Sequence, residues 1–106
     1  MEAASVESIV MELVVNGGDA RSKALEALMA AREGDFELAE KRMEECNESL
    51  NQAHHFQTSL IQKEMSGESQ EKVSLIMVHG QDHLMNAMTV RDLAVEMIEM
   101  YRIIKG

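Results

Sequence analysis

The chain has 106 residues, enough for one compact domain and too few for two, so we expect residues 1–106 to form a single domain. Nineteen acidic residues against ten lysines and arginines give a formal net charge of −9, which argues against binding to nucleic acid or docking on an anionic membrane. The longest uninterrupted aliphatic run near the centre, Leu75 to Val78, is far too short for insertion into a bilayer.

Composition favours an all-α protein in a reducing compartment. Ten residues are Met, none is Pro, and the abundant Ala, Glu, Leu and Lys residues are strong helix formers. Cys46 is the only cysteine, so no internal disulfide can form. Acidic residues precede any lysine or arginine at the start of the chain, unlike the basic start of a secretory leader. We therefore expect a cytoplasmic protein.

Two chain reversals divide the sequence into three helical segments of about thirty residues each. Gly34-Asp35 offers a terminal glycine for one helix and a capping aspartate for the next. The second reversal lies at Ser66-Gly67-Glu68-Ser69, where Ser69 is placed to cap the last helix. These breaks predict a three-helix, up-down-up antiparallel bundle.

The first segment has small or aliphatic residues at the spacing of one helix face, at Ile9, Leu13, Gly17, Ala20, Ala24, Leu28 and Ala31. The run Asn16-Gly17-Gly18-Asp19 lies in its middle and should loosen or kink the helix. One interpretation is that glycine lets another helix pack closely there. The alternative is a role at a functional site.

The second segment has a heptad-like stripe formed by Ala39, Met43, Cys46, Leu50, Ala53, Gln57 and Leu60. Because Cys46 falls on this stripe, we interpret it as a packing residue rather than a nucleophile. The neighbours His54 and His55 point about 100° apart on a helix, so at most one of them can readily join a given site.

The third segment carries apolar residues on two faces. One stripe contains Val73, Met77, Gly80, Leu84, Ala87, Met88, Val95 and Ile98, and the other contains Leu75, Val90, Leu93, Met97 and Ile104. The second stripe is interrupted by His79, Asp82, His83 and Asn86, which fall within about one quadrant of the helix. Gln81 falls on a narrow face that looks solvated. A helix that is apolar on two sides needs more cover than two companions supply, so we predict self-association through it.

The polar cluster admits several chemistries. His79 and His83, at positions i and i+4 beside Asp82, could chelate one metal ion, although the chain lacks the Glu-x-x-His and His-Glu-x-x-His patterns of helical metal sites. Copies of Asp82 could instead converge on a symmetry axis around a hard divalent cation such as Mg²⁺. His79 could also accept a phosphoryl group, with His83 orienting the phosphoryl oxygens, or it could be purely structural.

Longer stretches narrow this choice. The segment from Val78 to Met85, His-Gly-Gln-Asp-His at its centre, resembles the active-site segment of the lactose/cellobiose-type enzyme IIA of the bacterial phosphoenolpyruvate-dependent sugar phosphotransferase system (PTS). Val15 to Ser22, Ala31 to Phe36 and Leu50 to His55 resemble the same family, in the expected order and spacing. The resemblance covers nearly the whole chain and is more specific than one short motif.

The resemblance implies a phosphocarrier. His79 would receive a phosphoryl group from phospho-HPr and pass it to a cysteine of the cognate IIB component, which works with the IIC permease on a β-linked disaccharide such as lactose, cellobiose or chitobiose. Asp82 matches the family's metal-binding aspartate, which implies a divalent ion, expected to be Mg²⁺, on the axis of a homotrimer. Gln81 and His83 would be neighbours of the site.

Two other functions are also compatible with a helical chain that carries one histidine-centred polar cluster. A non-enzymatic helical adaptor could use the polar cluster only to fix its oligomeric register. A histidine phosphotransfer domain of two-component signalling is also helical and also uses one histidine, but the residues after His79 do not resemble that family.

Overall fold

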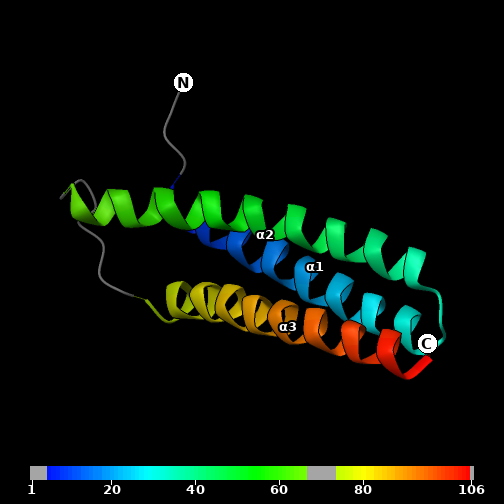
Figure 1. Ribbon diagram of the computed structural model, residues 1–106. Coiled ribbons are helices and arrows are strands. Elements are labelled where there is room, and N and C mark those ends of the chain that lie inside the picture. The colour runs from blue at the N-terminus through cyan, green and yellow to red at the C-terminus, as the bar shows by residue number, and fades with distance from the viewer. Residues whose placement is uncertain (1–4, 67–73, 106) are drawn as a thin grey trace.

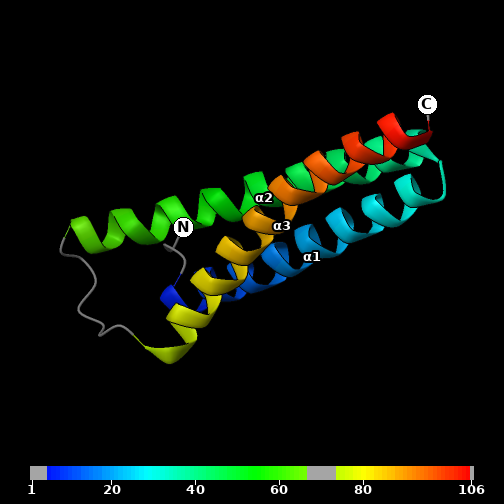
Figure 2. The same cartoon turned by 60° about the horizontal axis from the view of Figure 1, so that its bottom comes forward.

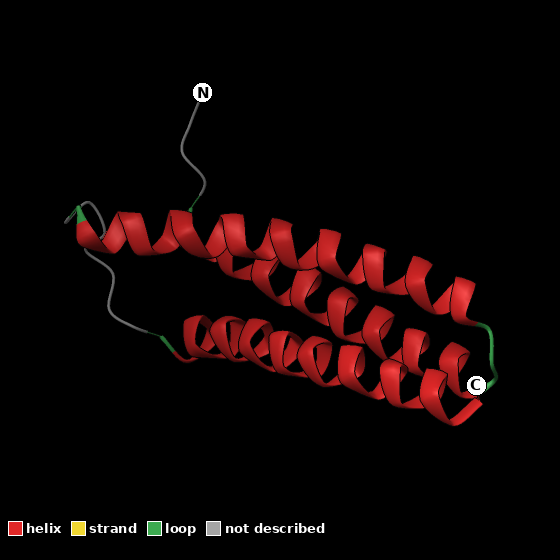
Figure 3. Cartoon of the chain, viewed as in Figure 1, coloured by secondary structure: helices red, strands yellow, loops and turns green. Residues whose placement is uncertain are grey.

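The computed structural model describes residues 5–66 and 74–105. These residues form three helices and no strand: α1 (Val6–Arg32), α2 (Phe36–Met65) and α3 (Leu75–Lys105), as Figures 1 and 3 show. The bundle is elongated, with extents of 55 × 26 × 18 Å. Within the described ranges no helix is long and apolar enough to cross a membrane. The predicted three-helix, up-down-up bundle is confirmed.

Local capping explains the first reversal. The side chain of Ser5 accepts a hydrogen bond from the Ser8 N–H at 3.1 Å and so begins α1. Gly34 follows the end of α1 with φ at +86°, the left-handed conformation that glycine adopts without strain. The Asp35 carboxylate then accepts a hydrogen bond from the Leu38 N–H at 3.1 Å and begins α2. The prediction for Gly34 and Asp35 is confirmed.

The second reversal is described on both of its sides. Helix α2 ends at Met65, directly before the predicted break. Ser69, the predicted cap, and Val73, predicted on the buried stripe, lie outside the described residues. At the described start of α3, the Ser74 hydroxyl oxygen accepts a hydrogen bond from the Met77 N–H at 3.2 Å, so Ser74 caps the helix there.

Helix α1 is the centre of the bundle. It packs against both other helices, whereas α2 and α3 touch each other much less. Figure 2 shows α3 approaching α2 toward the C-terminal end and separating from it toward the other end. The buried face of α1 is rich in alanine, which lets both neighbours come close to its backbone: Ala20, Ala24, Ala27, Ala30 and Ala31. The position of α3 is therefore set mainly by α1.

The core is aliphatic. Its larger part contains Ile9, Leu13, Leu50 and Leu84, and a smaller cluster around Ile98 closes the opposite end. Cys46 is fully buried in the larger part, and burial raises the pKa of its thiol. The interpretation of Cys46 as a packing residue agrees with this environment.

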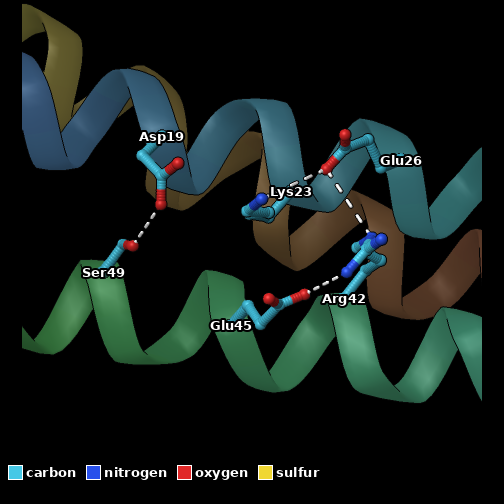
Figure 4. Close-up of polar contacts among 6 residues, drawn as sticks. All are labelled: Asp19, Lys23, Glu26, Arg42, Glu45 and Ser49. Atoms are coloured by element: carbon cyan, nitrogen blue, oxygen red, sulfur yellow. Dashed lines mark hydrogen bonds and ion pairs between the residues drawn. The ribbon is translucent and has the colours of Figure 1, made fainter.

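Polar contacts on the surface connect α1 to α2, as Figure 4 shows. The Ser49 hydroxyl donates to the Asp19 carboxylate at 2.6 Å. Arg42 pairs with Glu45 at 2.6 Å and lies 3.9 Å from Glu26 on α1. The hydrogen bond from Arg42 lowers the pKa of Glu45. These contacts help to fix the register of α1 against α2.

The two apolar stripes of α3 have different environments. Met77, Gly80, Leu84, Ala87 and Ile98, all from the first stripe, are buried against the rest of the bundle. Val95, assigned to the same stripe, is 43% exposed and lines a groove between α2 and α3. The second stripe is mostly uncovered within one chain, with exposed side chains at Leu75, Leu93, Met97 and Ile104.

Candidate functional site

His79 and His83 form a pair on the outer side of α3. Their ring centroids are 4.5 Å apart and their planes meet at 83°, so one ring edge faces the other ring. His79 is exposed and His83 is half-buried. Because the two residues are four apart on one helix, the backbone fixes this arrangement without help from a loop.

The backbone beneath this pair lies directly on α1. Gly80 is buried, and a Cβ atom added there would lie 2.9 Å from Val10 Cγ1 and 3.6 Å from Leu13 Cβ. Gly17 is also buried, and a Cβ atom added there would meet the backbone of His83 at 3.2 Å. Helix α1 runs through the Gly17 region without interruption. The close-packing interpretation of this glycine is therefore confirmed.

Gln81 connects the site to α2. Its side-chain oxygen accepts a hydrogen bond from the Gln57 amide at 2.9 Å, and both side chains are half-buried. The sequence reading of Gln81 as part of a solvated face was wrong, since the side chain turns toward α2. Gln57 was missed as its partner. The available signal was a glutamine on the otherwise apolar stripe of α2.

Asp82 points to the uncovered face of α3. It is exposed and lines a hollow of about 630 Å³ together with Leu75, Ile76, Val78 and His79. In the part of the chain that the structure describes, no group of three His, Cys, Asp or Glu side chains is placed to hold a metal ion. A chelate formed by His79, Asp82 and His83 of one chain is therefore not assembled. An exposed carboxylate on an apolar face fits a hard cation only if other copies supply further oxygens.

Comparison with known proteins assigns the chain to a family. Residues 8–102 match the family described as "PTS system, Lactose/Cellobiose specific IIA subunit". The chain belongs to this family. As an enzyme IIA component it is a phosphotransferase component that carries a phosphoryl group, which favours the phosphocarrier reading over the adaptor and two-component readings.

Several relatives of this IIA chain have specific names. It is 52% identical over 96 residues to the lichenan-specific phosphotransferase enzyme IIA component of Bacillus subtilis, covering 91% of this chain and 86% of that protein. It is 46% identical over 105 residues to the N,N'-diacetylchitobiose-specific EIIA component of Escherichia coli K12, covering 99% and 90%. A lactose-specific EIIA component of Staphylococcus epidermidis is 44% identical and covers 96% and 97%.

Solved structures share the same bundle. The cellobiose-specific enzyme IIA of Bacillus anthracis matches with a TM-score of 0.91 and 44% identity, covering 98% of this chain and 94% of that one. A chain from the complex between the chitobiose IIA protein and HPr of Escherichia coli matches with a TM-score of 0.84 and 44% identity, covering 98% and 100%.

The geometry of this IIA chain suits a phosphoryl carrier. An exposed imidazole can offer a nitrogen lone pair to phosphorus, and an adjacent ring that donates N–H can stabilise the phosphoryl oxygens. The helix holds both rings in place before a partner arrives, so little ordering is needed at the moment of transfer. His79 and His83 meet both conditions, whereas Asp82 and Gln81 flank them on different faces of α3.

Proposed function

We propose that His79 accepts the phosphoryl group, and the observation that carries the proposal is the exposed His79 ring set edge to face with His83 on one rigid helix. A ring nitrogen of neutral His79 forms a bond to phosphorus while the donor's bond to phosphorus breaks. The reverse exchange then passes the group to the next protein. Docked partners exclude water, so the group is relayed rather than hydrolysed.

His83 and Gln81 assist this step in different ways. His83, one turn after His79, donates an N–H to a phosphoryl oxygen and so offsets the negative charge that arrives. Gln81 is a neighbour held by Gln57, and it keeps α3 in register with α2 next to the site. Neither residue replaces His79 as the acceptor.

The partners in this proposal are phospho-HPr as donor and the cysteine of a cognate IIB component as acceptor. Support comes from the similar chitobiose IIA protein, which has been solved in complex with HPr. The IIC permease takes part only indirectly, through IIB. A cytoplasmic location is part of the proposal and agrees with the buried free thiol of Cys46.

The transported sugar is a β-linked disaccharide or a related glucoside. This class is supported by relatives that are specific for lichenan, chitobiose and lactose. The sugar class is assigned through these relatives, because in this proposal the chain itself carries the phosphoryl group rather than the sugar.

A homotrimer with a metal ion on its axis completes the proposal. The uncovered stripe of α3 includes Leu75, which is 86% exposed, and Ile104, which is 72% exposed, so association would bury apolar surface. Asp82 lies on that face. Three Asp82 carboxylates brought together would hold a divalent ion, proposed to be Mg²⁺, which would neutralise their mutual repulsion.

Phosphorylation in a reconstituted system tests the central step. The protein is incubated with phosphoenolpyruvate, enzyme I and HPr and is then measured by intact mass. The wild type should gain one phosphoryl mass and His79→Ala should gain none. His54→Ala and His55→Ala, which alter exposed histidines on α2, are matched controls and should gain it. A wild type that stays unmodified while a known IIA protein is phosphorylated, or a phosphorylated His79→Ala, would refute the assignment.

A further inference from the structure

The backbones of α1 and α3 are in direct contact beneath the histidine pair. A Cβ atom added at Gly17 would lie 3.2 Å from the His83 carbonyl carbon, 3.3 Å from the His83 oxygen and 3.3 Å from the Leu84 nitrogen. All three are backbone atoms, so no side-chain rotation can make room. Leu84 is fully buried, which limits rotation of α3 about its own axis. Any side chain at Gly17 must push α3 away from α1.

A second close approach lies one turn earlier on α3. Gly80, directly after His79, would bring an added Cβ to 2.9 Å from Val10 Cγ1. Gly17 of α1 and Gly80 of α3 therefore let the segment from His79 to Leu84 pack closely on α1 at two points along the helix. His79 and His83 both lie on this segment.

Gly18, the residue after Gly17 in α1, has no such contact. An added Cβ there would find nothing within 4 Å. Gly17 and Gly18 both lie in the interior of α1, where each weakens the helix to a similar extent relative to alanine. Only the contact with α3 distinguishes Gly17 from Gly18.

Helix α1 also carries exposed apolar side chains close in sequence to the residues that contact α3. Met11 is 53% exposed and Val15 is 59% exposed. On a helix these two residues fall within about 40° of one another, on the outer face of α1. A partner that contacts these α1 side chains as well as His79 is sensitive to the spacing of the two helices, because a shift of α3 relative to α1 changes the position of His79 relative to α1.

We propose that Gly17 is a positioning residue for phosphoryl transfer, which sets the distance between α1 and α3 and thereby the reach of His79 toward a docked partner. The inference rests on the proposed function of His79. Transfer requires the acceptor nitrogen and phosphorus to approach within about 3.5 Å, and small misplacements slow such steps steeply. A displacement of a few tenths of an ångström where Gly17 meets the His83 backbone is passed to His79, because His79 and His83 lie one turn apart on the same helix.

The test compares Gly17→Ala with Gly18→Ala. Single-turnover transfer from phospho-HPr is measured over a range of donor concentrations, which gives a maximal rate and a half-saturating concentration. Gly17→Ala should lower the maximal rate about three- to tenfold and change the half-saturating concentration less than twofold. Gly18→Ala should keep a maximal rate within about twofold of wild type, since its Cβ meets no atom.

Other outcomes separate the possible failures. The role of Gly17 would be overturned if both variants kept the wild-type maximal rate or if both lost it equally. A change in the half-saturating concentration alone would also overturn it. A wild type that accepts no phosphoryl group would instead overturn the function of His79. If Gly17→Ala does not fold, Val10→Ile applies a milder push about two turns earlier on α1, next to Gly80. It should lower the maximal rate about twofold or more, and an unchanged rate would also overturn the inference.

Discussion

A histidine ring on the outside of a rigid helix can meet a second protein without any rearrangement of its own backbone. His79 has this position, and its neighbour His83 lies edge to face with it at 4.5 Å between ring centroids. The surrounding side chains are held by specific contacts, such as the hydrogen bond from Gln57 to Gln81. At the residue scale, the proposed acceptor is exposed and the side chains around it are held by specific contacts.

The contact between Gln57 and Gln81 gives a measurable coupling. Gln57→Ala, Gln81→Ala and the double variant should show a coupling of about 1 kcal/mol in the free energy of unfolding, the usual net value for a half-buried hydrogen bond. Urea denaturation measures it. Gln52→Ala, at an exposed position of α2, should change stability by less than about 0.5 kcal/mol. Additive losses at Gln57 and Gln81 would contradict the contact.

Cys46 should be unreactive in the folded protein. The thiol is fully buried and its pKa is raised by burial, so the thiolate that reacts with iodoacetamide is scarce. A raised pKa favours folding below the ordinary value of about 8.5, and this contribution is lost as the pH rises through the raised pKa. At pH 8, mass spectrometry should find Cys46 alkylated in urea and protected in buffer. Rapid alkylation of the native protein would contradict the packing role.

At the scale of the elements, α1 holds both other helices and the turns fix its ends. Gly34 and Asp35 were predictable because capping depends on neighbouring residues alone. The buried positions of α2 and most of those of α3 followed from helical periodicity. Periodicity placed Gly17 rather than Gly18 on the face of small residues, but it could not show that Gly17 meets the backbone of α3 or pair Gln57 with Gln81, because these facts depend on where separate helices cross. The exposure of Val95 could not be predicted for the same reason, since periodicity does not reveal the groove between α2 and α3 at that level.

Substitution by alanine should change the free energy of unfolding in opposite directions at Gly18 and Gly34. Gly18→Ala should raise the free energy of unfolding by about 0.5–1 kcal/mol, because alanine is the better helix former and the added Cβ meets nothing. Gly34→Ala should lower it by about 1–2 kcal/mol, because φ of +86° strains an L-residue. Urea denaturation at one fixed protein concentration measures both. The same sign for the two changes would contradict the assigned conformations.

The whole molecule leaves one long apolar face without cover. Leu75, Leu93, Met97 and Ile104 are exposed along α3, and Asp82 lies among them. A single copy gives no account of this surface, whereas a symmetric trimer would bury it and bring the aspartates together. The residues of one chain predicted the need for a partner copy.

Replacing Asp82 tests the proposed assembly. Asp82→Leu should form a trimer that no longer depends on Mg²⁺, because converging charges are replaced by apolar volume. Asp92→Leu is the matched control, since Asp92 pairs with Arg91 on another face of α3 and its loss should leave metal dependence as in wild type. Multi-angle light scattering with and without EDTA measures both. Monomers of wild type and of Asp82→Leu under all conditions would contradict the trimer.

The most direct measurement follows the phosphoryl group itself. Protein labelled from phosphoenolpyruvate is freed of donor enzymes, part of it is digested to locate the label, and the rest is mixed with a cognate IIB component. The label should reside on His79 as an acid-labile group and should pass to the IIB cysteine. Label on any other residue, or label released as inorganic phosphate without reaching IIB, would contradict the account.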